Sequence, residues 1–105
     1  WAQEVEILSK DVKGKISYAF IDQLVRAALS IPLNIAEGNG RWHTADKRQF
    51  YFIARGSTFE CVPIIELFRR TQTIDDKKHA TYLASLDEIS KMLTGLIQSV
   101  EKLKP

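Results

Sequence analysis

The chain has 105 residues, a net charge of +2 and a hydrophobic content of 45%, proportions that predict one small globular domain over residues 1–105. A charge this close to zero does not by itself indicate a nucleic-acid binder, so the position of the charges matters more than their sum. The single cysteine, Cys61, excludes an internal disulfide framework and a multi-cysteine zinc site, and it fits a reducing cytoplasm. The apolar runs are too short to cross a bilayer, and we expect no membrane partner.

The first predicted helix covers residues 1–13, and Lys13-Gly14-Lys15 breaks it. Its apolar positions are spaced four, three and four residues apart, which is typical of a helix that packs along one side. These positions are Trp1, Val5, Leu8 and Val12.

The second predicted helix begins after Ser17, a residue type that caps helix N-termini. It ends at Gly38-Asn39-Gly40, because glycine and asparagine tolerate the left-handed conformation of a helix end. Pro32 lies inside the helix, so we expect a kink and a carbonyl without its usual partner at Ala28. The predicted core stripe is Ile21, Leu24, Ala28, Ile31 and Ile35.

Thr44 is the predicted N-cap of the third helix. In the middle of that helix Gly56 and Ser57 are small enough to let a neighbouring backbone come close, and Pro63 should bend it as Pro32 bends the second. The predicted core stripe is Phe50, Ile53, Ser57, Cys61, Ile64 and Phe68.

The fourth predicted helix follows Thr73-Ile74-Asp75-Asp76, which has the pattern of a capping box. Its apolar residues are spaced 3.5 residues apart on average, as in coiled-coil packing. They are Tyr82, Leu86, Ile89, Leu93, Leu96, Val100 and Leu103. No segment alternates like a strand. Four helices with short connections predict an all-α, up-down-up-down antiparallel four-helix bundle.

The apolar faces of the third and fourth helices are wider than a small bundle needs. Further large apolar side chains lie beside both stripes, and they indicate either a subunit interface or a broad monomer core. We favour the interface. The residues are Phe52, Phe59, Leu67, Leu83, Met92 and Ile97.

The sequence gives little support to an enzyme. A di-iron bundle needs two Glu-x-x-His motifs, whereas this chain has only Asp76-x-x-His79, with His43 at the other end of the bundle. Cys61 lies on an apolar stripe without a base nearby in sequence, so it is expected in the core. We expect no catalytic residue, no metal and no cofactor.

Five polar residues in the second and third helices lie on or beside predicted packed faces. Buried charges must be paired, so Arg55 and Glu37 are expected to meet across the two helices. Asn34 could satisfy a backbone group freed by Pro32. A structural network that fixes helix register or a subunit interface is favoured over a catalytic role. Its members are Arg26, Asn34, Glu37, Arg55 and Glu60.

Basic residues gather at both ends of the predicted bundle. One end has seven basic against three acidic residues, and the other has an aromatic residue, Trp42, among its cations. In a ring of subunits such patches would attract the phosphate backbone of a nucleic acid. In a single subunit they are more simply explained as solvent-exposed cations that stabilise helix ends. The candidate nucleic-acid-binding residues are Lys13, Lys15, Arg41, Lys47, Arg48, Arg69, Arg70, Lys77 and Lys78.

Two motifs, Ser30-Ile31-Pro32-x-Asn34-Ile35-Ala36-Glu37-Gly38 and Ile53-Ala54-Arg55-Gly56-Ser57, resemble the four-helix bundle proteins encoded by intervening sequences of 23S ribosomal RNA genes. Accessory variability determinant proteins of diversity-generating retroelements are similar. Phe59-Glu60-Cys61-Val62-Pro63 departs from the Leu/Glu-rich run usual in the family and favours the retroelement branch.

The resemblance implies a homopentamer. In the retroelement branch it also implies a non-enzymatic partner of a reverse transcriptase that binds RNA or DNA. The alternative is an oligomeric bundle of the intervening-sequence type, with no direct nucleic-acid role.

Overall fold

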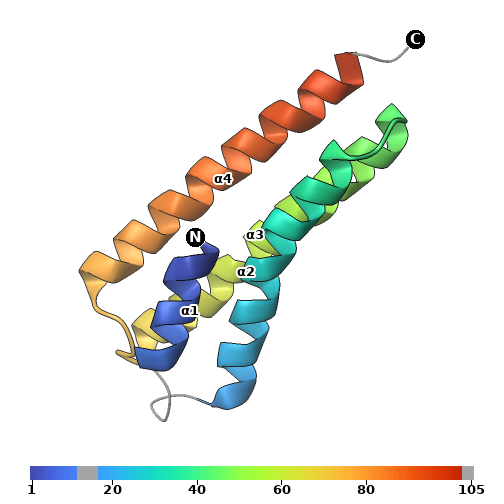
Figure 1. Ribbon diagram of the computed structural model, residues 1–105. Coiled ribbons are helices and arrows are strands. Elements are labelled where there is room, and N and C mark those ends of the chain that lie inside the picture. Colours follow the sequence, from blue (N-terminus) through green and yellow to red (C-terminus); the bar gives the residue numbers. More distant parts are fainter. Residues whose placement is uncertain (12–16, 103–105) are drawn as a thin grey trace.

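The computed structural model describes residues 1–11 and 17–102 and is all-helical there (Figure 1). Helix α1 spans Ala2–Asp11, α2 spans Tyr18–Asn39, α3 spans Thr44–Arg70 and α4 spans Asp76–Lys102. Successive helices run antiparallel and form a rod of 51 × 21 × 17 Å. The predicted up-down-up-down four-helix bundle is confirmed. The break at Lys13-Gly14-Lys15 lies outside the described residues.

Helix α3 is the centre of the bundle, because it packs against both α2 and α4, while the short α1 packs against α2. The main core joins side chains from all four helices, with Phe68, Ile65 and Leu24 among its most buried members. A second, smaller core lies at the far end, where Tyr51 of α3 meets Ile97 and Val100 of α4. The α2–α3 turn and the α3–α4 loop therefore lie at opposite ends of the rod (Figure 1).

The predicted core of α2 is confirmed: four of its five stripe residues are buried, and Ile35 packs against the core from its edge. The predicted stripe of α3 is wrong in its first half, where Tyr51 and Ala54 are buried and Ile53 is 43% exposed. Phe50 and Tyr51 are both apolar, and so are Ile53 and Ala54, so the sequence pattern could not show which residue of each pair faces the core.

The proposed helix caps are partly confirmed. Ser17 caps α2, and its hydroxyl accepts from the backbone N–H of Ala19. The cap of α3 is His43 rather than Thr44. At α4 the capping side chain is Asp75, whose carboxylate accepts from the Lys78 N–H at 2.7 Å, and not Thr73.

Helix α2 ends differently from expectation, because Gly40 is right-handed, with φ −84°. A left-handed residue is found instead in the α3–α4 loop, at Gln72, with φ 58°. Helices α2 and α3 continue through Pro32 and Pro63, and Figure 1 shows α2 changing direction near its middle. Proline removes one backbone hydrogen bond there.

The length and composition of α2 would allow it to cross a membrane, which the short apolar runs had not indicated. In the bundle, however, Leu24, Ala28 and Ile31 of this helix are buried in the core. An amphipathic core helix passes the same test of length and composition.

Candidate nucleic-acid interface

The α3–α4 loop is held by local hydrogen bonds that let α3 stop and α4 start within a few residues. The Thr71 hydroxyl donates to the Leu67 carbonyl at 3.0 Å, and the Thr73 N–H donates to the Phe68 carbonyl at 2.8 Å. The left-handed Gln72 between them completes the reversal of the chain. These hydrogen bonds hold the backbone of the α3–α4 loop in place, so the loop presents its side chains from a fixed position.

An open hollow of about 650 Å³ lies in this loop. Its two acidic residues are already engaged, since Asp75 caps α4 and Asp76 accepts from Arg69 Nε at 3.4 Å. Arg70 and Lys78 also line the hollow. Among residues 1–11 and 17–102, neither of them has an ion-pair partner. The hollow therefore carries one net positive charge, from Arg69, Arg70 and Lys78 against Asp75 and Asp76, and two of its cations are free of direct ion pairs within the described residues.

Lys77 is exposed beside the hollow, on the first turn of α4. The C-terminal end of α1 and the start of α2 lie at the same end of the rod as this loop (Figure 1). Lys13 and Lys15, the other candidates for this end, lie outside the described residues.

At the opposite end, the cations of the α2–α3 turn are largely engaged within the chain. Arg41 pairs with Glu37 at 3.2 Å, and its guanidinium lies 4.8 Å from the centre of the Phe50 ring. The Lys47 ammonium donates to the carbonyls of Gly38 and Asn39, both at 3.2 Å. Lys47 thus satisfies two carbonyls at the end of α2 and keeps only one of its three donors for an external partner.

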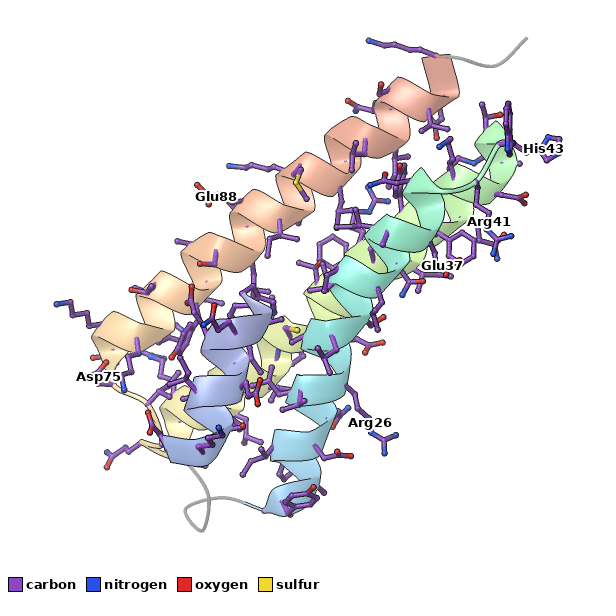
Figure 2. The ribbon with its side chains drawn as sticks, in the orientation of Figure 1. Arg26, Glu37, Arg41, His43, Asp75 and Glu88 are labelled. Atoms are coloured by element: carbon purple, nitrogen blue, oxygen red, sulfur yellow. The ribbon has the colours of Figure 1, made fainter. Side chains whose placement is uncertain are left out.

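Arg48 and Trp42 complete this end. Arg48 lines a hollow of about 400 Å³ on the outer side of α3, together with Ala45, Gln49, Phe52 and Ile53. Trp42 is 95% exposed. Figure 2 shows Arg41 and His43 at the same turn, directed away from the bundle.

The predicted Glu37–Arg55 pair does not form. Arg55 instead donates to the Thr94 hydroxyl on α4 at 3.1 Å and lies 5.0 Å from the centre of the Phe52 ring. A pair within one helical turn costs less side-chain entropy than one between helices, which favours Arg41 as the partner of Glu37.

Of the other members of the predicted network, Arg26 and Glu60 are exposed and Asn34 is half-buried. Arg26 pairs with Asp22 one turn away at 2.9 Å, and its side chain points away from the bundle (Figure 2). Asn34 donates to the carbonyl and the hydroxyl of Ser30, at 2.8 and 3.0 Å, and not to the Ala28 carbonyl.

Replacing Glu37 with alanine should therefore change the free energy of unfolding by less than about 1 kcal/mol, because a one-turn ion pair on the surface contributes little. The Glu37 side chain is 60% exposed. Urea unfolding of the variant and the parent measures this. A loss of more than about 3 kcal/mol would instead indicate a buried charge left unpaired.

Besides the Arg55–Thr94 bond, further polar contacts between helices were not predicted, and two of them lie away from the α2–α3 turn. The Ser57 hydroxyl of α3 donates to the Ser30 hydroxyl of α2 at 2.7 Å, so small residues do bring these two helices together. His79 of α4 and Glu66 of α3 lie 2.6 Å apart. The sequence could have indicated the second contact, because Glu66 and His79 lie on either side of the same short loop.

The His79 hydrogen bond, together with the charges of His79, Arg69 and Arg70, holds the pKa of Glu66 below its ordinary value of 4.5. A carboxyl with a depressed pKa stabilises the fold above its unfolded-state pKa and loses that contribution as the pH falls through the folded value. The difference in melting temperature between the parent and Glu66→Gln should thus persist down to about pH 4.5 and shrink at lower pH. A difference that grows on acidification would contradict the pair.

Cys61 is fully buried, and this burial raises the pKa of its thiol to about 11. A protonated, enclosed thiol is a core residue and a poor nucleophile. Within the described part of the chain, no three His, Cys, Asp or Glu residues lie close enough together to hold a metal ion.

A sequence profile described as "23S rRNA-intervening sequence protein" matches residues 1–95. The crystal structure of a protein of unknown function from the S23 ribosomal protein family of Bacteroides thetaiotaomicron has the same fold, with a TM-score of 0.86 and 27% identity over 91% of this chain and 90% of the other. A comparison with curated proteins found no match. The chain belongs to the 23S rRNA-intervening sequence protein family.

Proposed function

We propose that this protein is a non-enzymatic, homo-oligomeric accessory protein that binds nucleic acid at the ends of its bundle. The observation that carries the proposal is the hollow of the α3–α4 loop, where Arg70 and Lys78 are in no direct ion pair within the described residues, while Asp75 caps α4 and Asp76 pairs with Arg69. Clustered cations without partners favour phosphate binding, because contact with phosphate releases the counterions of the nucleic acid.

Self-association is part of the proposal, because each added subunit would contribute another copy of the hollow. One face of α3, turned away from the core, carries an apolar stripe in which every residue is exposed. We call it the outer α3 stripe; its residues are Ala45, Phe52, Gly56, Phe59 and Pro63. Large exposed apolar surfaces on a small domain mark interaction sites.

In its most specific form, we propose a homopentamer in the cytoplasm that serves a reverse transcriptase of a diversity-generating retroelement.

The second candidate is an oligomeric bundle of the intervening-sequence type without a nucleic-acid role. The net charge of +2 favours it, and so does the position of Arg69 and Arg70 in the last turn of α3, where cations stabilise the helix dipole.

Light scattering coupled to size exclusion, with and without a structured RNA at two salt concentrations, separates the two candidates. The nucleic-acid function predicts an oligomer that shifts with RNA at low salt and shifts less at high salt. An oligomer that ignores RNA at both salt concentrations leaves the second candidate.

The double variant Arg70→Glu/Lys78→Glu tests the surface itself. Its RNA affinity should fall sharply, and the remaining affinity should depend less steeply on salt, by about one in the logarithmic slope for each phosphate that the protein no longer neutralises. The matched control is Arg26→Glu/Lys91→Glu, which makes the same charge change at one-turn surface pairs on the sides of the rod. Equal binding by both double variants would exclude the loop.

A further inference from the structure

We propose that Trp42 is a stacking platform for an unpaired base of a single-stranded nucleic acid, presented on the rigid α2–α3 turn at the end of the rod opposite the α3–α4 loop. This inference rests on the proposed nucleic-acid function. It adds to that function a second contact site, and it specifies that this site binds a single-stranded nucleic acid.

The first observation is the exposure of the side chain. Trp42 is 95% exposed, whereas the other tryptophan, Trp1, packs its ring edge against Tyr82 with 5.8 Å between ring centres. A tryptophan gains more from burial than almost any other side chain. A fully exposed one gains nothing from the fold of its own subunit, so its indole is available to a partner.

The second observation is the rigidity of the turn that holds it. Gly38 packs directly against the Tyr51 ring, and the Tyr51 hydroxyl donates to the Asn39 side chain at 2.5 Å. Lys47 binds the last carbonyls of α2, and the Arg41 N–H donates to the Gly38 carbonyl at 3.2 Å. Contacts on both sides of Trp42 therefore fix the backbone. A side chain carried on a fixed backbone loses less entropy on binding than one carried on a mobile loop.

The third observation is the charge around the indole. Arg41, Lys47 and Arg48 face Glu37 and Asp46 in this part of the chain, which leaves one net positive charge. Such a weakly basic tip is a poor match for the dense charge of a duplex, whose bases are also stacked inside and out of reach. Aromatic residues beside moderate positive charge are instead the pattern of single-strand binding, where each base offers a free face.

The test uses the full chain with Trp1→Phe, so that Trp42 is the only tryptophan; phenylalanine keeps a ring against Tyr82. Tryptophan emission and its quenching by acrylamide are followed over a range of protein concentrations, with anionic lipid vesicles, and with three nucleic-acid probes. These are an oligoadenylate strand of about twelve nucleotides, within the usual range of single-strand sites, an abasic strand of the same length, and a hairpin duplex.

We expect the oligoadenylate to quench Trp42 emission and the abasic strand to leave it unchanged. In the parent background, Trp42→Ala should weaken oligoadenylate binding about tenfold. It should leave both the affinity for the duplex and the salt dependence unchanged, since no charge is removed. Trp42→Phe should retain most of the affinity, because a smaller ring still stacks.

Four outcomes would overturn the inference. Unchanged oligoadenylate binding by Trp42→Ala, with binding sharply weakened by Arg70→Glu/Lys78→Glu, would remove Trp42 and leave the proposed function standing. Absence of binding to every nucleic acid at low salt would remove both. Acrylamide protection of Trp42 that rises with protein concentration would assign it to a subunit contact. An emission shift on anionic lipid vesicles without base-dependent quenching would assign it to a membrane surface.

Discussion

If the protein self-associates through the outer α3 stripe, as we propose, Phe59→Glu should yield single subunits that remain folded. Phe59 is 55% exposed, in the middle of the outer α3 stripe, so a charge there meets water in the free subunit and causes little strain. In an assembly the same carboxylate would be buried against apolar surface without a partner. The cost of burying an unpaired charge exceeds what a small interface gains.

The geometry of α3 explains why this face is available. Its buried side holds Tyr51, Ala54 and Cys61 against α2 and α4. Side chains one residue further along, such as Phe52, turn by about 100° and leave the core. Within its own chain, a Cβ added to Gly56 would meet nothing within 4 Å. A second copy could therefore approach the α3 backbone closely at this position.

Light scattering measures the change in mass, and circular dichroism shows whether the helices persist. Ile7→Glu is the matched control, because Ile7 is as exposed as Phe59, at 57%, but lies on α1. Loss of assembly in Phe59→Glu alone supports the outer α3 stripe as an interface. Equal assembly in both variants would place the interface elsewhere, and a parent protein that is already a single subunit would refute self-association.

The fold was predictable from the sequence because it depends on a repeated signal. Apolar residues at a helical period recur through every helix, and each repeat adds to the same conclusion. The core positions of α2 were predicted correctly, and Ile31 is buried as expected. In α4 Leu93 is buried as expected, but Ile97, which was predicted beside the stripe, is buried as well. The family motifs pointed to the same architecture.

Individual contacts were less predictable, because each depends on which of two similar residues faces the core or which of two cations pairs with a carboxylate. The stripe of α3 shifted by one residue at Phe50 and Tyr51, where both side chains are aromatic. The charge pairs failed for a related reason. Glu37 pairs with Arg41 one turn away, whereas Arg55 donates to Thr94 on α4, and a local partner costs less entropy to hold.

The candidate site was predictable in part. The sequence identified the ends of the rod as basic, but it did not show which cations the chain itself uses. Lys47 is engaged by the last carbonyls of α2, whereas Arg70 and Lys78 have no carboxylate partner in the described ranges. This difference depends on which side chains bind the free carbonyl groups at the helix ends, and that can be seen only in the structure.

Gly38→Ala should lower the free energy of unfolding by about 1–3 kcal/mol, the usual cost of overpacking a filled site, and Gly95→Ala should raise it by about 0.5–1 kcal/mol. A Cβ on Gly38 would lie 2.7 Å from the Tyr51 ring and 3.2 Å from the Phe50 Cβ, while one on Gly95 would meet nothing within 4 Å. Both glycines are inside helices, so the same substitution isolates the effect of the surroundings.

The Tyr51 ring cannot easily move aside, because it is buried and its hydroxyl is held by Asn39. The clash must therefore shift the end of α2 itself. Thermal unfolding measures both variants, and for a chain of this size each kcal/mol corresponds to about 4–8 °C in melting temperature. Two variants that shift in the same direction would mean that packing at Gly38 is not tight. Opposite shifts would show that this glycine lets α2 lie against α3 at the turn that carries Trp42.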